Sequence, residues 1–172
     1  MDPAIEIPYA WVRATRARLM AAMEALDEAS YTEPQPVLAG ASVRDRFVHI
    51  ADCYDFWLRC VGLEEGEGVR VRAAAFPDLA AARAAFVRVD ALVGGFSAAF
   101  ARRLDEPLAR TLDGAPATLT ARWLLAHPVT HEFHHKGQIV VALRLMGVDA
   151  SDNDLAKPLA VRGAGPTAGA DR

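Results

Sequence analysis

Hydrophobic residues recur at three- and four-residue spacing in long stretches of the chain, with polar residues between them. This spacing is typical of helices that bury one face. Four such stretches predict an all-α four-helix bundle, because helices of this length pack side by side to cover their apolar faces. The predicted helices run over Pro8 to about Ala29, Ser42 to about Val61, from just after Pro77 to Leu104, and Thr118 or Thr120 to Met146.

Breaking and capping residues separate the predicted helices. The run EPQP follows the first helix, and EEGEG and Asp113-Gly114 mark later loops. Ser42 with Asp45 three residues on is similar to a capping box, and Gly147 is a natural end for the last helix. No stretch alternates with a period of two, so no strand is expected.

The composition is that of an ordinary globular protein, with 52% hydrophobic and 24% charged residues in 172. A net charge of −3 gives no basic surface for nucleic acid. The N-terminus lacks the features of a signal peptide and no apolar run is long enough for a membrane span, so a cytoplasmic location is expected. We expect one domain over residues 1–161 and a disordered tail over 162–172.

The last predicted helix carries a stripe of histidines. His127, His131 and His135 follow at four-residue steps and therefore line one face, with His134 to one side. Residues four apart are neighbours, so His131 and His135 can bind one metal ion. The alternative is a set of core histidines, but each would then need its own buried hydrogen-bond partner.

The run HEFHH, residues 131 to 135, also fits the zinc-protease pattern H-E-x-x-H. A catalytic zinc needs a third protein ligand. Proteases commonly take it from downstream, but no Glu follows Glu132 and no His follows His135. With no strand expected to hold a peptide, an HExxH zinc protease remains only a remote alternative.

The third ligand is better sought upstream, where His49 is the only other histidine. Asp45 and Asp52 are its helical neighbours, and a carboxylate commonly holds the second ring nitrogen of a metal-binding His. A solvated surface His is the alternative. Cys53 is either a thiolate ligand or, more often for such a residue, a small core side chain.

Two segments resemble a known family. LLAHPVTHEFHHKGQIVVALRLMG resembles the C-terminal helix of the DinB/YfiT-like superfamily of metal-dependent enzymes, and FVHIADCYDFWL resembles its second helix. The resemblance implies a four-helix bundle whose metal is held by His49, His131 and His135. His127 matches a recurrent family histidine that is not usually a ligand. Pro128 within the helix departs from the pattern and is expected to kink it.

The resemblance also implies a function. Three His ligands leave coordination positions open, which suits catalysis. Zn²⁺ or Ni²⁺ are the first candidates for the divalent metal ion, followed by Fe²⁺ or Mn²⁺. Characterised relatives use low-molecular-weight thiols, so the leading expectation is a thiol-dependent S-transferase or a hydrolase acting on a small molecule. The alternative is a non-catalytic metal-binding protein of the bacterial stress response.

Two further residues are candidates for catalytic roles. Gln138 lies one turn from His135 and could orient a ligand at the open position, or simply make an inter-helix hydrogen bond. Glu132 could act as a base, but a surface Glu paired with Lys136 is the preferred interpretation.

The opposite side of the last helix is apolar, with Val129, Phe133 and Val140. Either a neighbouring helix or a homodimer must cover this face, and the homodimer is slightly favoured.

Overall fold

The computed structural model describes residues 3–66 and 73–150. Residues 151–172 lie outside this part, and with them the predicted tail over 162–172 and the end of the predicted domain. All five histidines of the chain fall within the described residues.

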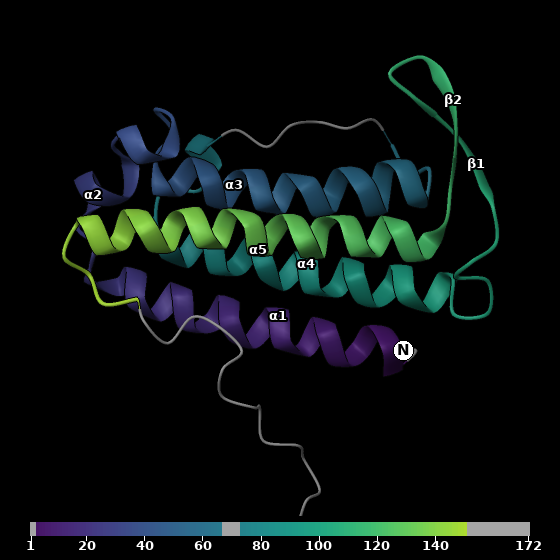
Figure 1. Ribbon diagram of the computed structural model, residues 1–172, viewed down its shortest axis with the longest axis horizontal. Helices are drawn as coiled ribbons and strands as arrows, with labels where there is room; N and C mark the ends of the chain where they lie inside the picture. Colours follow the sequence, from purple (N-terminus) through teal and green to yellow (C-terminus); the bar gives the residue numbers. More distant parts are fainter. Residues whose placement is uncertain (1–2, 67–72, 151–172) are drawn as a thin grey trace, which may run out of the picture.

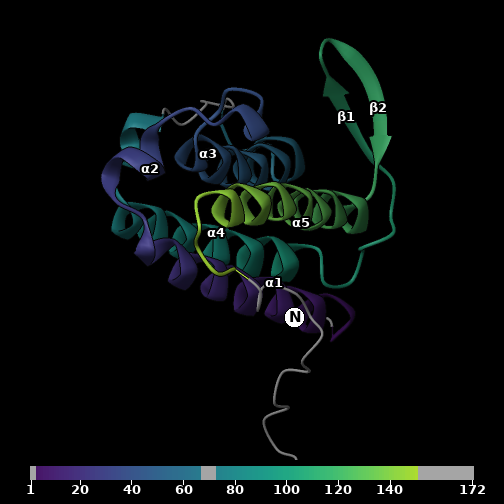
Figure 2. The ribbon, with the colours of Figure 1, turned by 60° about the vertical axis from the view of Figure 1, so that its left-hand side comes forward.

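Four long helices lie side by side and form a bundle (Figures 1 and 2). Helix α5 packs against both α1 and α3, and α4 packs against α3 and its π-helical continuation η3. The prediction of a mostly helical four-helix fold is confirmed. The bounds are Pro3–Ala22 for α1, Val43–Tyr54 for α3, Asp55–Gly62 for η3, Leu79–Ala99 for α4 and Ala121–Leu145 for α5.

The predicted capping box at the start of α3 is present. The Ser42 hydroxyl accepts a hydrogen bond from the Asp45 N–H at 3.0 Å, and the Asp45 carboxylate accepts one from the Ser42 N–H at 2.9 Å. These bonds satisfy backbone donors that the first helical turn leaves without partners. Thr120 caps α5 in a similar way by accepting from the Trp123 N–H.

The first predicted helix is wrong in its second part. Helix α1 stops at Ala22, and the chain continues through a 3-10 turn into a separate short helix. Asp27 caps that helix, because its side chain accepts a hydrogen bond from the Ser30 N–H at 2.8 Å. Such a cap starts a new helix, so the single continuous helix expected over this stretch is divided in two. The short helical elements are η1 (Met23–Ala25), α2 (Glu28–Thr32), η2 (Pro36–Leu38) and η4 (Ala73–Ala75).

The expectation of no strands is also wrong. Strands β1 (Leu108–Leu112) and β2 (Ala115–Leu119) pair antiparallel and form a hairpin at one end of the bundle (Figure 1). Asp113 and Gly114 join them with φ values of 49° and 79°, the left-handed geometry of a two-residue hairpin turn. The strands are mostly exposed, so they need no alternating hydrophobic pattern. The Asp-Gly pair, interpreted only as a loop, was the signal that could have predicted the hairpin.

The hairpin is attached to the end of η3. Arg110 on β1 donates hydrogen bonds to the carbonyls of Val61 at 2.6 Å and Gly62 at 2.9 Å. A helix end exposes carbonyls without internal partners and carries partial negative charge, which a guanidinium satisfies on both counts. Gly62 itself is packed against Phe96 so closely that an added Cβ would lie 2.3 Å from the Phe96 ring.

The core fills the space between the four long helices. Its largest fully buried side chains come from α1, α3, η3, α4 and α5 and include Leu19, Phe47, Tyr54, Phe96 and Leu143. Both cysteines are free thiols. None of the helices in residues 3–66 and 73–150 combines the length and apolar character that crossing a bilayer requires.

The apolar back of α5 is covered within the chain. Val129, Phe133 and Val140 are partly buried and pack against the hydrophobic core, and helix α1 runs along this part of α5. This packing lies within the chain and so fits the first of the two alternatives considered for this face, a neighbouring helix. The homodimer stays a prediction that needs a different surface.

Candidate metal centre

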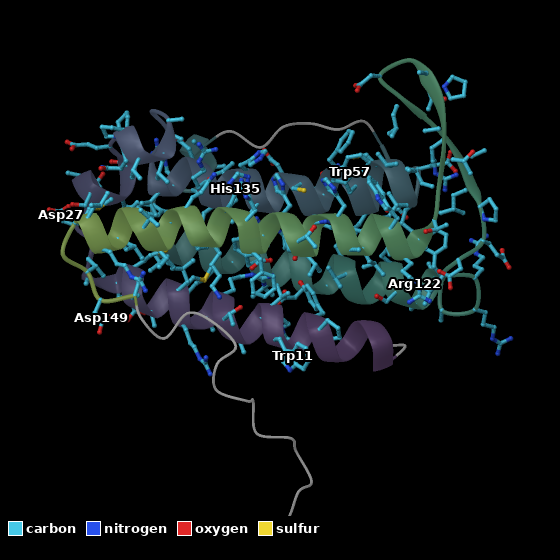
Figure 3. The ribbon with its side chains drawn as sticks, in the orientation of Figure 1. Trp11, Asp27, Trp57, Arg122, His135 and Asp149 are labelled. Carbon is cyan, nitrogen blue, oxygen red and sulfur yellow. The ribbon has the colours of Figure 1, made fainter. Side chains whose placement is uncertain are left out.

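The histidines of the site come from two antiparallel helices. Helix α3 carries His49, and α5 carries His131 and His135 one turn apart. Because α3 and α5 pack directly on each other, the three rings meet at their interface. Figure 3 shows His135 near the middle of the bundle, between these two helices.

The three rings approach one another through their Nε2 atoms. The Nε2 of His131 lies 2.9 Å from the Nε2 of His49 and 3.0 Å from the Nε2 of His135. One Nε2 carries at most one proton, so His131 cannot donate to both neighbours. Nitrogens bound to one ion at a length of about 2.0–2.1 Å lie roughly 2.8–3.4 Å apart for angles between about 90° and 110°, a range that includes these separations. The geometry therefore fits a divalent metal ion better than a hydrogen-bonded cluster.

The protonation of the rings suits metal binding. Burial, together with the smaller effects of the nearby His135 and His49 rings, lowers the pKa of His131 to about 4. Burial also lowers the pKa of His135, against a smaller opposing effect of its hydrogen bond to Gln138. Both rings are thus neutral near pH 7, and a neutral imidazole offers the lone pair that a metal requires.

Gln138 fixes the orientation of His135. Its Oε1 accepts a hydrogen bond from the Nδ1–H of His135 at 2.8 Å, and its amide nitrogen donates to the Nε2 of the exposed His134 at 3.1 Å. With its proton on Nδ1, His135 presents an unprotonated Nε2 to the other two rings. Such outer partners orient metal-binding histidines and raise their basicity. Both hydrogen bonds lie within α5, whereas the alternative considered for Gln138 was an inter-helix bond, and its role in orienting a ligand at the open position stays a prediction.

An aromatic wall adjoins the three rings. The His127 ring stacks on Trp123 at 5.2 Å between centroids and on His131 at 5.7 Å, and Trp57 packs against it at 4.7 Å. Trp123 and Phe56 remain 42% and 41% exposed, so this wall is open to solvent. Trp57 lies in the π-helical segment η3, toward the hairpin end of the bundle in Figure 3.

The comparison with family models gives one match, to the DinB family over residues 4–160. The chain belongs to the DinB family. A search of curated proteins finds no match. The resemblance inferred from the histidine motifs is therefore confirmed, and the candidate three-His site lies within the matched residues.

Glu132 of this DinB-family protein does not lie on the surface, and that expectation is wrong. The side chain is only 4% exposed. Its two oxygens accept hydrogen bonds from Arg16 Nε at 2.8 Å and Nη2 at 2.9 Å, and from the Tyr54 hydroxyl at 2.7 Å. Among the residues that the structure describes, Glu132 does not join the groups able to hold a metal. The letters H-E-x-x-H thus place the carboxylate on a different side of α5 from the two imidazoles.

A buried polar network surrounds Glu132 and was missed by sequence reasoning. Arg16 also donates to Asp90 at 2.8 Å, and the Tyr9 hydroxyl donates to the same carboxylate at 2.6 Å. The network links α1, α3, α4 and α5. A signal was present, because Arg16 is a charged residue four positions after Val12 in the buried stripe of the first helix.

Cys53 is a buried thiol near the same interface. Burial raises its pKa to about 12, and the negative charge of Asp52 adds to the effect. The free side chain is therefore a protonated thiol at neutral pH, consistent with the core role considered for it. It does not belong to the group formed by His49, His131 and His135.

Proposed function

We propose that this DinB-family protein is a metal-dependent enzyme in which His49, His131 and His135 hold a divalent ion with open coordination positions. The reaction we propose is thiol-dependent S-transfer, or hydrolysis, on a small molecule. The observation that carries the proposal is the convergence of three Nε2 atoms at 2.9 and 3.0 Å, with at least two of the rings neutral. Zn²⁺ or Ni²⁺ are the preferred ions, with Fe²⁺ or Mn²⁺ next.

The chain's own residues would divide the work as follows. The three imidazoles hold the ion from one side, and Gln138 keeps the His135 lone pair directed at it. An ion held there supplies Lewis acidity, which lowers the pKa of a water or a thiol at its free positions. The exposed faces of Trp123 and Phe56 give the apolar part of a small substrate a surface to pack on.

The ligand set is tested by metal analysis of protein purified without added metal. We expect close to one ion per chain in the natural protein and a large loss in His49→Ala, because two remaining histidines on one helix make an incomplete site. His134→Ala is the matched control, since His134 is an exposed histidine of α5 outside the three-His group. Full metal content in His49→Ala would show that the three-His assignment is wrong.

The reaction class is tested by conjugation of electrophiles with low-molecular-weight thiols, with and without a chelator. We expect chelation to remove the rate above the uncatalysed background and the preferred metal to restore it. A rate that the chelator does not change would overturn the enzyme proposal. Full occupancy without thiol-dependent rate or hydrolysis would leave the non-catalytic metal-binding protein as the better description.

A homodimer is the remaining proposal on assembly. Large apolar side chains that stay exposed in the single chain support it, among them Val87 at 69% and Leu145 at 72%. Light scattering or sedimentation on the full chain measures the state directly. A monomer at all accessible concentrations would contradict the proposal.

A further inference from the structure

A second group of metal-binding side chains lies one helical turn along the α3–α5 interface. The ligand atoms of Cys53, His127 and His131 all lie within 4.8 Å of one another, as do those of the three-His group. Cys53 follows His49 by four residues on α3, and His127 precedes His131 by four on α5. Because the helices are antiparallel, one step along the interface exchanges the pair His49 and His135 for the pair Cys53 and His127.

The chemistry of this second group differs from that of the first. One sulfur and two imidazole nitrogens form a donor set for soft, thiol-seeking ions, whereas three imidazoles suit borderline divalent ions. The thiol is free, and a coordinating thiol gives up its proton to solvent when an ion binds.

The surroundings of the group favour a held geometry. Cys53 is only 8% exposed, and the His127 ring is packed against Trp57 and Trp123. A core histidine would need a buried partner, whereas this ring is packed among aromatic rings beside a thiol and a second imidazole.

We propose that Cys53, His127 and His131 form a second metal site for thiophilic ions, and that it shares His131 with the three-His site. Because both groups draw on the single ring of His131, we expect ions at the two sites to compete for that ring, and a soft ion to be held one helical turn away from a borderline ion. This inference does not depend on the proposed enzyme activity.

The test is a titration of the metal-free full chain with Cd²⁺, followed by the ultraviolet absorption of thiolate-to-metal charge transfer. We expect the band to appear in the natural protein, to be lost in Cys53→Ser, and to persist in Cys60→Ser. Cys60 is the matched control, because it is the other free cysteine and belongs to neither group. Absence of the band in the natural protein, or its loss only in Cys60→Ser, overturns the proposal.

Two histidine variants separate this site from the three-His site. His49→Ala should keep the cadmium band, because His49 belongs only to the three-His group. Loss of the band in His49→Ala would instead make Cys53 a further ligand of the first site and overturn the second one. His127→Phe keeps an aromatic ring between the tryptophans but removes the lone pair, so it should weaken cadmium binding. An unchanged cadmium titration in His127→Phe also overturns the proposal, with circular dichroism used to confirm that each variant is folded.

Discussion

Helix α5 carries two polar clusters, and adjacent residues of one motif belong to different clusters. His131 joins the imidazoles at the α3 interface, whereas Glu132 joins the buried network with Arg16 and Asp90. In the network each carboxylate has a guanidinium partner, and both tyrosine hydroxyls donate to carboxylates. In the imidazole cluster the same kind of atom, an imidazole Nε2, meets from three sides, and the three rings form one group able to hold a metal ion.

The difference separates structural polar groups from functional ones. A buried charge that is paired and hydrogen-bonded is complete without a ligand, and such a network holds the helices in one arrangement. Three nitrogen lone pairs directed at one point are complete only when a cation lies there. One side of α5 therefore helps to hold the helices together, and the other side carries the candidate metal ligands.

The largest expected effect is a loss of unfolding free energy when the buried network around Glu132 is broken. Arg16→Leu leaves Glu132 without its guanidinium partner, whereas Asp90 keeps its ion pair with Arg13. Breaking a buried ion pair costs about 3–5 kcal/mol of unfolding free energy. Denaturant unfolding measures this loss. Arg83→Leu is the control, because its ion pair with Glu24 is about half exposed and should contribute no more than about 1 kcal/mol. Equal losses of unfolding free energy in the two variants would contradict a special structural role of the buried network.

A smaller effect is expected on metal affinity at the imidazole cluster. Gln138→Leu removes the acceptor that holds the Nδ1–H of His135, so metal affinity should fall by about 10–100-fold. The free energy of unfolding of the metal-free protein should change much less than in Arg16→Leu. Competition titration with a chromophoric chelator gives the affinity. An unchanged affinity would mean that Gln138 does not orient the ligand.

Acid should act on the imidazole cluster through its lowered pKa values. Unfolded His131 binds a proton near pH 6.5, but the folded residue does so only near pH 4. Below pH 6.5 the unfolded state therefore binds more protons, and the metal-free protein loses stability as the pH falls from 6.5 towards 4. Urea midpoints between pH 5 and 7 measure the slope, which should be shallower in His131→Phe. Equal slopes in the two proteins would contradict the lowered pKa.

The smallest effect is expected from a substitution on the exposed face of α5 that leaves both clusters unchanged. Gly137 is exposed within α5, and an added Cβ there would meet no heavy atom within 4 Å. Gly137→Ala should therefore stabilise the protein by about 0.5–1 kcal/mol, because alanine favours a helix more than glycine. Metal affinity should stay the same. A changed affinity would show that the site responds to helix stability in general, which would blur the distinction between the two sides.

The sequence predicted the long helices well where the local pattern was strong. Ser42 and Asp45 predicted the start of α3, and the histidine spacing on α5 identified the face that carries the candidate ligands. The pattern failed at Asp27, where a cap starts a new short helix, and at Asp113-Gly114, where a turn joins two exposed strands. Both are local signals of a few atoms, and a search for hydrophobic periodicity does not detect them.

Sequence alone thus determined the helical architecture, the family and the two histidines on one face of α5, because each depends on spacing within a single element. Tertiary structure alone decided the partners between elements. It directed Glu132 to Arg16 of α1 and set Cys53 beside His127, whereas the meeting of His49 with His131 had already been implied by the family resemblance. Such contacts depend on how helices far apart in the chain are packed and rotated, and the spacing within one helix carries no record of that rotation.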